Sequence, residues 1–512
     1  MIYKVRLEDL AVSSEEELAV VRDQVKESRL FNEDLAPAGP KRRTWGTWNL
    51  AALWVGLAIC ITTYTLASGL MAAGMNWWEA LFTIGLGNLI VLVPLILNGH
   101  AGTRYGIPFP IFVRASFGTR GANIAALARA LVACGWFGIQ TWLGGLAVNA
   151  ILIVLWPGWA SVPAHEFIAF GVFWIVQMVV IVRGMESVRI FETWSAPLLL
   201  VVSLALLAWG LAAGGGIGHV FAASVKLQQG HAPFWLLFGP GLMANIGYWA
   251  TLSLNIPDFT RFARSQRTQV WGQAIGLPLS MILFSFIGIA VTAATVVIYG
   301  HAVWNPVTLL TQIKMGPVLL ILVMIVILIA QAAVNLGANV VAPSNDFSNV
   351  APRRISFRTG SIITGIIGVV SFPWLLYQSA GAYIFTWLGG YGSLLGAIGG
   401  IMIADYWLVR HQRLELADLY KPDGNYRYNN GFNGIAIVAL LVAVVPIIPG
   451  FIAAATTPGG VVAHPGVWDR LYTFGWLFTF IVSILVYWGL TVLTKSRAPV
   501  SVRSTGLADT AE

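Results

Sequence analysis

Trp136 and Gln140 are the residues of this 512-residue chain whose types and spacing point most directly to chemistry. Four residues apart on a helix, they share one face. An indole offers a flat surface for stacking, and a carboxamide offers a donor and an acceptor side by side. The pair therefore suits a flat, uncharged heterocycle with amide-like edges. The alternative is that Trp136 packs and Gln140 forms an interhelical hydrogen bond, as polar residues commonly do in membrane bundles.

The element that must position this pair is an apolar run at 122–156, which is too long for a soluble core helix. Hydrophobic residues make up 57% of the chain, charged residues make up 10%, and the mean hydropathy is +0.76. These values predict a polytopic membrane protein. Cys60 and Cys134 both lie in apolar runs, which excludes a disulfide framework or a cysteine metal site.

Apolar segments along the chain predict an all-α integral membrane protein with twelve transmembrane spans. The predicted spans are 47–71, 78–97, 122–156, 167–182, 195–213, 234–256, 271–299, 317–342, 360–376, 382–409, 434–452 and 473–493. A polar arm precedes them, and Ser13-Ser14-Glu15-Glu16-Glu17 in this arm is typical of a helix start. The arm lacks the pattern of a cleavable signal peptide.

The basic residues support this topology, because cytoplasmic loops are enriched in Lys and Arg. With twelve spans and a cytoplasmic N-terminus, the outer loops hold only Lys226, Lys314 and Arg470. We therefore predict a multi-pass protein of the plasma or inner membrane with both termini in the cytoplasm. The net charge of +8 then reflects topology and gives no reason to expect nucleic acid as a partner. Arg129, near the cytoplasmic start of the third span, is expected to snorkel to the membrane surface.

Two predicted spans contain glycines, prolines or small polar residues at mid-depth. In the first span these residues lie between Gly56 and Tyr64. The sixth span contains Gly239-Pro240-Gly241 and then Asn245-Ile246-Gly247-Tyr248-Trp249. They stand five spans apart, which indicates a transporter with inverted repeats and discontinuous helices. The alternative is that the glycines permit close packing. Gln331, Asn335 and Asn339 share one face of the eighth span, where they either bond neighbouring helices or face a cavity.

Several functions are disfavoured by missing motifs. No G-x-x-x-x-G-K-[ST] loop is present, which argues against ATP-driven transport by this chain alone. No H-E-x-x-H motif and no mid-membrane carboxylate pair is present, so we predict that the protein is not an enzyme. Filter-like repeats and basic gating helices are also absent, which weakens a channel interpretation.

Several motifs, in order along the chain, resemble the nucleobase:cation symporter-1 family of hydantoin, allantoin, uracil and cytosine permeases. They are Asn32-Glu33-Asp34-Leu35-Ala36-Pro37, Arg43-Thr44-Trp45, Asn98-Gly99-His100-Ala101-Gly102, Arg114-Ala115-Ser116-Phe117-Gly118, Trp136-Phe137-Gly138-Ile139-Gln140-Thr141-Trp142, Asn255-Ile256-Pro257-Asp258-Phe259-Thr260-Arg261-Phe262 and Asp405-Tyr406-Trp407. The resemblance implies a LeuT-like fold of five plus five inverted helices with two additional C-terminal helices. The domains are then a cytoplasmic arm (1–43), a first repeat (44–213), a second repeat (234–409), two extra helices (434–494) and a cytoplasmic tail (495–512).

The resemblance also implies a substrate site. It places the family's two stacking tryptophans on Trp136 and Trp249 and its two amide ligands on Gln140 and Asn339. Cys60 falls where hydantoin carriers have a substrate-contacting glutamine, and we also assign Gly247 to the site. The implied substrate is a nucleobase or related cyclic ureide of the uracil, allantoin or hydantoin class, with no obligatory protein partner and only the lipid bilayer around it.

The coupling ion is less well defined. Family members that use sodium hold it between first-span carbonyls, here Gly56 and Ile59, and an eighth-span carbonyl, here Ala330, with two hydroxyls. The hydroxyl positions are Ala333 and Val334 in this chain. Because sodium prefers several oxygen ligands, we expect symport with a proton rather than with sodium and no other cofactor. Thr62 and Thr63 are the residues that could compensate.

Two other functions remain open. The chain could be a facilitator or channel-like uniporter for a small neutral solute, which the missing hydroxyls make more plausible. It could also be a membrane enzyme or a transporter-derived receptor, although no catalytic constellation supports either. Uphill accumulation that a proton ionophore abolishes distinguishes a symporter from a uniporter.

Overall fold

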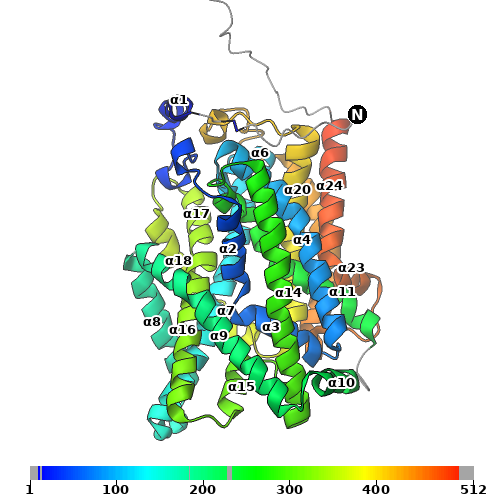
Figure 1. Ribbon diagram of the computed structural model, residues 1–512. Coiled ribbons are helices and arrows are strands. Elements are labelled where there is room, and N and C mark those ends of the chain that lie inside the picture. Colours follow the sequence, from blue (N-terminus) through cyan, green and yellow to red (C-terminus); the bar gives the residue numbers. More distant parts are fainter. Residues whose placement is uncertain (1–9, 12–13, 184, 228–232, 495–512) are drawn as a thin grey trace, which may run out of the picture.

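A computed structural model describes residues 10–11, 14–183, 185–227 and 233–494. Within these residues the chain is helical and contains no strand, and the helices pack as one bundle (Figure 1). The α-helices are α1 (Glu15–Val25), α2 (Thr47–Ala58), α3 (Ile61–Ala72), α4 (Trp77–Tyr105), α5 (Phe109–Phe112), α6 (Arg114–Phe117), α7 (Ala122–Leu155), α8 (His165–Arg183), α9 (Met185–Ala213), α10 (Ile217–Leu227), α11 (Phe234–Tyr248), α12 (Ala250–Asn255), α13 (Pro257–Thr260), α14 (Gln266–Tyr299), α15 (Pro306–Gln312), α16 (Pro317–Asn339), α17 (Val341–Val350), α18 (Phe357–Val370), α19 (Pro373–Leu376), α20 (Gly389–Ile403), α21 (Gly434–Val444), α22 (Ile448–Thr456), α23 (Val467–Thr473) and α24 (Gly475–Leu493). Two π-helical segments, η4 (Ala382–Leu388) and η5 (Ala404–Val409), flank α20.

The predicted helix start in the arm is confirmed. Ser14 caps α1 through a reciprocal capping box with Glu17, which satisfies backbone donors at the first turn. The chain after α1 then docks onto the bundle, where the Tyr420 hydroxyl donates to the Leu35 carbonyl at 2.8 Å. The predicted tail, 495–512, lies outside the described residues, as do residues 1–9 of the arm.

Seven helices are long and apolar enough to cross a membrane, or nine if each of two sharply bent helix pairs is one span, among the residues that the structure describes. One bent pair is α2 with α3, at 58°. The three other predicted spans fall on α8, on α11 with α12, and on α18 with α19, whose apolar helices are shorter or interrupted. Multiple membrane crossings are therefore evident, whereas the number twelve and the inverted repeat stay predictions.

Both predicted discontinuities contain a break. The first lies between α2 and α3, where Ile59 and Cys60 leave the helical region, with Cys60 fully extended. The second lies at Trp249, between α11 and α12, with φ −102° and ψ 4°. Pro240 lies inside α11 without ending it. Both breaks lie next to the α7 face that carries Trp136 and Gln140, because Gln140 donates to Thr62 and the Trp136 indole packs against Tyr248.

Three basic residues that the sequence assigns to outer loops can be located in the structure. Figure 1 shows α1 and α6 at one end of the bundle and α10 and α15 at the opposite end, with α23 higher up beside α11. Lys226 lies in α10, Arg470 lies in α23, and Lys314 follows α15. Lys226 and Lys314 thus lie toward the end of the bundle opposite to α1, whereas the orientation of the two ends in a membrane stays a prediction.

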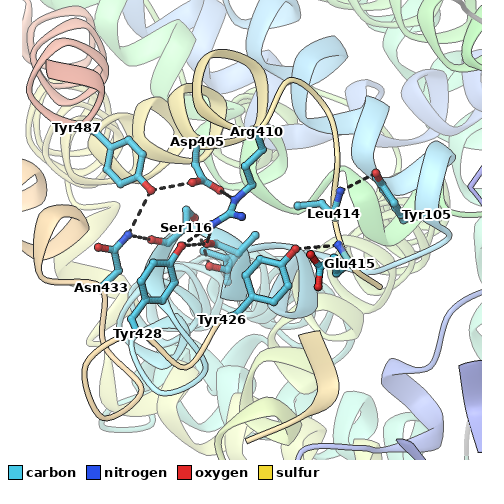
Figure 2. A network of polar contacts seen from close by, with 12 residues as sticks. Tyr105, Ser116, Asp405, Arg410, Leu414, Glu415, Tyr426, Tyr428, Asn433 and Tyr487 are labelled. Carbon is cyan, nitrogen blue, oxygen red and sulfur yellow. Dashed lines mark hydrogen bonds and ion pairs between the residues drawn. The ribbon is translucent and has the colours of Figure 1, made fainter. Parts of the chain in front are cut away.

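A buried polar network joins the C-terminal helix to the loop before α21 (Figure 2). Asp405 accepts from Arg410 Nε and from the Tyr487 hydroxyl, both at 2.7 Å. Arg410 also donates to the Ala115 carbonyl at 3.0 Å. Burial raises the pKa of Tyr428 to about 12, so its hydroxyl stays protonated and donates to the same carbonyl at 2.6 Å. The network therefore fixes the loop 410–433 against α6.

Candidate functional site

Trp136 and Gln140 lie on the buried face of α7, as their spacing predicts. Trp136 is 5% exposed and its indole donates to the Tyr391 hydroxyl at 3.0 Å. The Gln140 amide donates to the Thr62 hydroxyl at 3.3 Å. Its Oε1 is buried without a hydrogen-bond partner among the described residues. A buried, unused acceptor of this kind is costly, and a ligand donor would relieve the cost.

Trp249 reaches the same region from the break between α11 and α12. It is 3% exposed and its indole donates to Asn88 Oδ1 at 2.9 Å. Asn88 in turn donates to the Ile84 carbonyl, which holds its amide in place on α4. The indole NH is thus occupied by protein, and the ring face is what remains for a ligand.

Tyr248, which the sequence analysis did not single out, links the two breaks. Its hydroxyl lies 2.9 Å from the Thr62 hydroxyl, 3.0 Å from the Thr63 hydroxyl and 3.2 Å from Cys60 Sγ. All of these groups are buried. The start of α3 and the end of α11 are therefore joined by one hydroxyl cluster.

The three polar residues on one face of α16 have different roles: two of them bond neighbouring helices, and the third lines a cavity. Asn335 donates to Gln177 Oε1 at 2.8 Å and to the Phe137 carbonyl at 3.1 Å, and Gln331 donates to the Gln140 carbonyl at 3.3 Å. These two residues bond neighbouring helices. Asn339 donates to Asn335 Oδ1 at 3.0 Å and also lines a cavity.

The cavity has a volume of about 30 Å³ and brings four predicted site residues together: Trp136, Gln140, Trp249 and Asn339. Its other lining residues are Leu57, Thr62, Tyr248, Thr251, Leu252, Val334 and Ala338. This space holds little more than water. Small-molecule sites are usually roughly ten times larger. A heterocycle can therefore bind here only after side chains or helices move.

Two other predicted site residues, Cys60 and Gly247, do not line this cavity. Cys60 lies behind it, in the hydroxyl cluster of Tyr248. A Cβ on Gly247 would come within 2.4 Å of the Leu388 carbonyl oxygen, so this glycine lets α11 approach the chain before α20. Its role in the structure is close packing.

The predicted sodium positions offer few oxygen atoms that could bind the ion. Ile59 caps the end of α2, and Ala330, Ala333 and Val334 are buried on α16. Ala333 and Val334 carry no side-chain oxygen, and the Thr62 and Thr63 hydroxyls already pair with Tyr248. The residues present do not fit the five-oxygen sodium site that the resemblance describes.

Arg129 does not snorkel, and that expectation is wrong. Its Nη1 donates to Asp346 Oδ2 at 3.2 Å, and both side chains are 0% exposed. Because Asp346 on α17 neutralises the guanidinium inside the bundle, the side chain has no need to reach the surface. The ion pair ties α7 to α17.

The sequence contained weak signals for the residues that were missed. Tyr248 lies in the second interrupted segment, but a tyrosine there has no distinctive spacing. Asn88 lies on α4 outside the recognised motifs, and only its contact with Trp249 reveals its position.

Broken helices with a buried cavity beside their breaks are typical of membrane transporters. A solved structure of the nucleobase-cation-symport-1 transporter Mhp1, closed with bromovinylhydantoin bound, is similar, with a TM-score of 0.73 at 26% identity over 91% of this chain and 96% of that one. The purine-uracil permease NCS1 of Arabidopsis thaliana is 43% identical over 477 residues, covering 90% of this chain and 77% of the relative. The allantoin permease of Bacillus subtilis is 38% identical over 489 residues, covering 94% and 96%.

A family model described as permease for cytosine/purines, uracil, thiamine, allantoin matches residues 37–478. The chain therefore belongs to this family, the nucleobase:cation symporter-1 permeases. The resemblance that the motifs indicated is confirmed.

Proposed function

We propose that the protein imports a nucleobase or cyclic ureide of the uracil, allantoin or hydantoin class by secondary active transport. The observation that carries the proposal is the convergence of Trp136, Gln140, Trp249 and Asn339 on one cavity beside both helix breaks. Indole faces would stack on the ring, and the two carboxamides would pair with its amide edges. Twelve spans in a five-plus-five inverted repeat, with two further helices and both termini in the cytoplasm, would allow alternating access.

We further propose that a proton is the coupling ion. Support comes from the poor sodium donor set at Ala333 and Val334 and from the presence of Asp346, a buried carboxylate within the candidate span Pro317–Val350. Ionisable residues inside membrane spans commonly mark ion or proton pathways, and Asp346 pairs there with Arg129.

Uptake by purified protein in proteoliposomes tests both proposals. Labelled uracil, allantoin and benzylhydantoin are compared under an imposed pH gradient, with sodium replaced by choline. We expect one of them to accumulate above the external concentration, and we expect a proton ionophore to abolish this accumulation. A tenfold fall in initial rate on removing sodium would refute proton coupling, and equilibration without accumulation would support a uniporter.

Variants test the site itself. Trp136→Ala should weaken substrate binding by about 1–3 kcal/mol, the value of one base–aromatic stacking contact. Gln140→Ala, as a separate variant, should also weaken substrate binding, because it removes a hydrogen-bonding carboxamide. Trp271→Ala and Gln312→Ala are matched controls, because both residues are exposed and lie outside the cavity. Equal loss in site variants and controls would argue that the cavity is not the binding site.

A further inference from the structure

A second, larger cavity of about 610 Å³ lies at the end of the bundle that carries α1. It shares no lining residue with the substrate cavity. Four segments form its walls: the chain after α1, the turn before α7, the connection between α17 and α18, and the loop before α21. Its volume lies in the range of sites that bind metabolites.

Arginines surround this cavity. Arg29, Arg120, Arg353, Arg354 and Arg427 line it, no lysine does, and Asp423 is its only acidic lining residue. None of these five arginines forms an ion pair in the described part of the chain. A basic surface alone would follow from topology. Five arginines converging from four segments on one concave space are a more specific arrangement.

The bottom of the cavity is polar, and a buried arginine lies behind it. Asn349 lines the cavity, is 3% exposed, and donates to Asn123 Oδ1 at 2.8 Å. Its own Oδ1 accepts from Arg114 at 2.6 Å. Arg114 is fully buried behind the floor and also donates to the Leu419 carbonyl at 2.8 Å. The positive field inside the cavity therefore comes from below as well as from its rim.

The walls are held in place by backbone bonds. The amides of Arg120 and Gly121 both donate to the Gly431 carbonyl, at 2.8 and 2.9 Å, and Thr119 donates to the Tyr426 carbonyl at 3.2 Å. The same loop is anchored by the Arg410 network of Figure 2. Arg120 and Arg427 are therefore carried on ordered backbone, which reduces the entropic cost of binding a ligand.

We propose that this cavity is a binding site for a phosphate-bearing anion with two or more negative charges. Guanidinium forks match phosphate oxygens in bidentate pairs. A bound anion would contact the chain after α1 and the connection between α17 and α18 together. Soluble phosphorylated metabolites and anionic lipid headgroups share this chemistry.

The test uses the full-length protein with two probes. In the first arm, pyrophosphate is titrated calorimetrically against protein in phosphatidylcholine nanodiscs. In the second arm, thermal unfolding is compared in nanodiscs with and without phosphatidylglycerol. The pocket variant is R354Q/R427Q, and the control is R267Q/R358Q, which removes the same charge from exposed residues outside the cavity.

We expect saturable binding of pyrophosphate that weakens about tenfold or more in R354Q/R427Q and changes little in the control. A pocket-dependent stabilisation by phosphatidylglycerol without pyrophosphate binding assigns the site to lipid headgroups. If neither probe distinguishes the pocket variant from the control, the proposal is overturned.

Discussion

The ring of Tyr248 lies 5.3 Å from the indole of Trp136, with the two planes at 79°. The same ring lies 4.8 Å from the indole of Trp249, at 84°. One aromatic side chain thus contacts both predicted stacking surfaces edge to face. Since the cavity measures only about 30 Å³, neighbouring groups must move before a ligand ring can stack on either indole, and Tyr248 is the side chain that contacts both.

Tyr248→Phe should therefore alter ligand affinity. The substitution removes the hydroxyl that pairs with Thr62 and Thr63. The aromatic ring at position 248 should then move aside at a lower cost in free energy. We expect ligand binding to tighten several-fold, in line with the roughly 0.5–1.5 kcal/mol of one buried hydrogen bond. Tryptophan fluorescence titration measures this change. Weaker binding would mean instead that the Tyr248 hydroxyl itself contacts the ligand.

The fold was predictable where it depends on composition. Long apolar runs predicted a helical membrane protein, whereas the orientation inferred from the basic residues stays a prediction. The helix breaks fall inside the predicted stretches, at Ile59 and Cys60 and at Trp249, but not at every glycine or proline named there. Gly239-Pro240-Gly241 is contained in α11, because a membrane helix tolerates proline where neighbours satisfy its backbone, and the break follows at Trp249.

The site was predictable only in part. The resemblance placed four residues that the structure brings to one cavity, whereas Tyr248 depends on three-dimensional contacts with α3 that no local pattern encodes. Arg129 shows the same limit. Its partner Asp346 lies more than two hundred positions away, so sequence position alone favoured the membrane surface.

Gly247→Ala should destabilise the protein. The new methyl would meet the Leu388 backbone carbonyl at 2.4 Å, and neither helix can yield without repacking. We expect a loss of about 1–3 kcal/mol and reduced transport. Gly56→Ala is the matched control, because no atom lies within 4 Å of its added Cβ. Thermal unfolding in detergent measures both, and equal midpoints would contradict the packing role of Gly247.

Restoring two hydroxyls on α16 tests the account of ion coupling. Ala333→Ser with Val334→Thr adds oxygens at the positions that the family resemblance assigns to sodium, with little change in volume. We expect uptake to become sodium-stimulated, measured as the initial rate with sodium against choline. Ala332→Ser is a control at the neighbouring position. Unchanged sodium dependence would show that more than these hydroxyls is missing.

The buried pair of Arg129 and Asp346 makes the strongest stability prediction. Arg129→Met alone or Asp346→Leu alone leaves one charge buried without its partner and should cost about 3–5 kcal/mol. The double variant removes both charges and the desolvation cost of each. It should therefore recover much of this loss, as seen in thermal unfolding of the four proteins in detergent. Additive losses in the double variant would show that the two residues act independently, and the direct ion pair between α7 and α17 would then contribute nothing to stability.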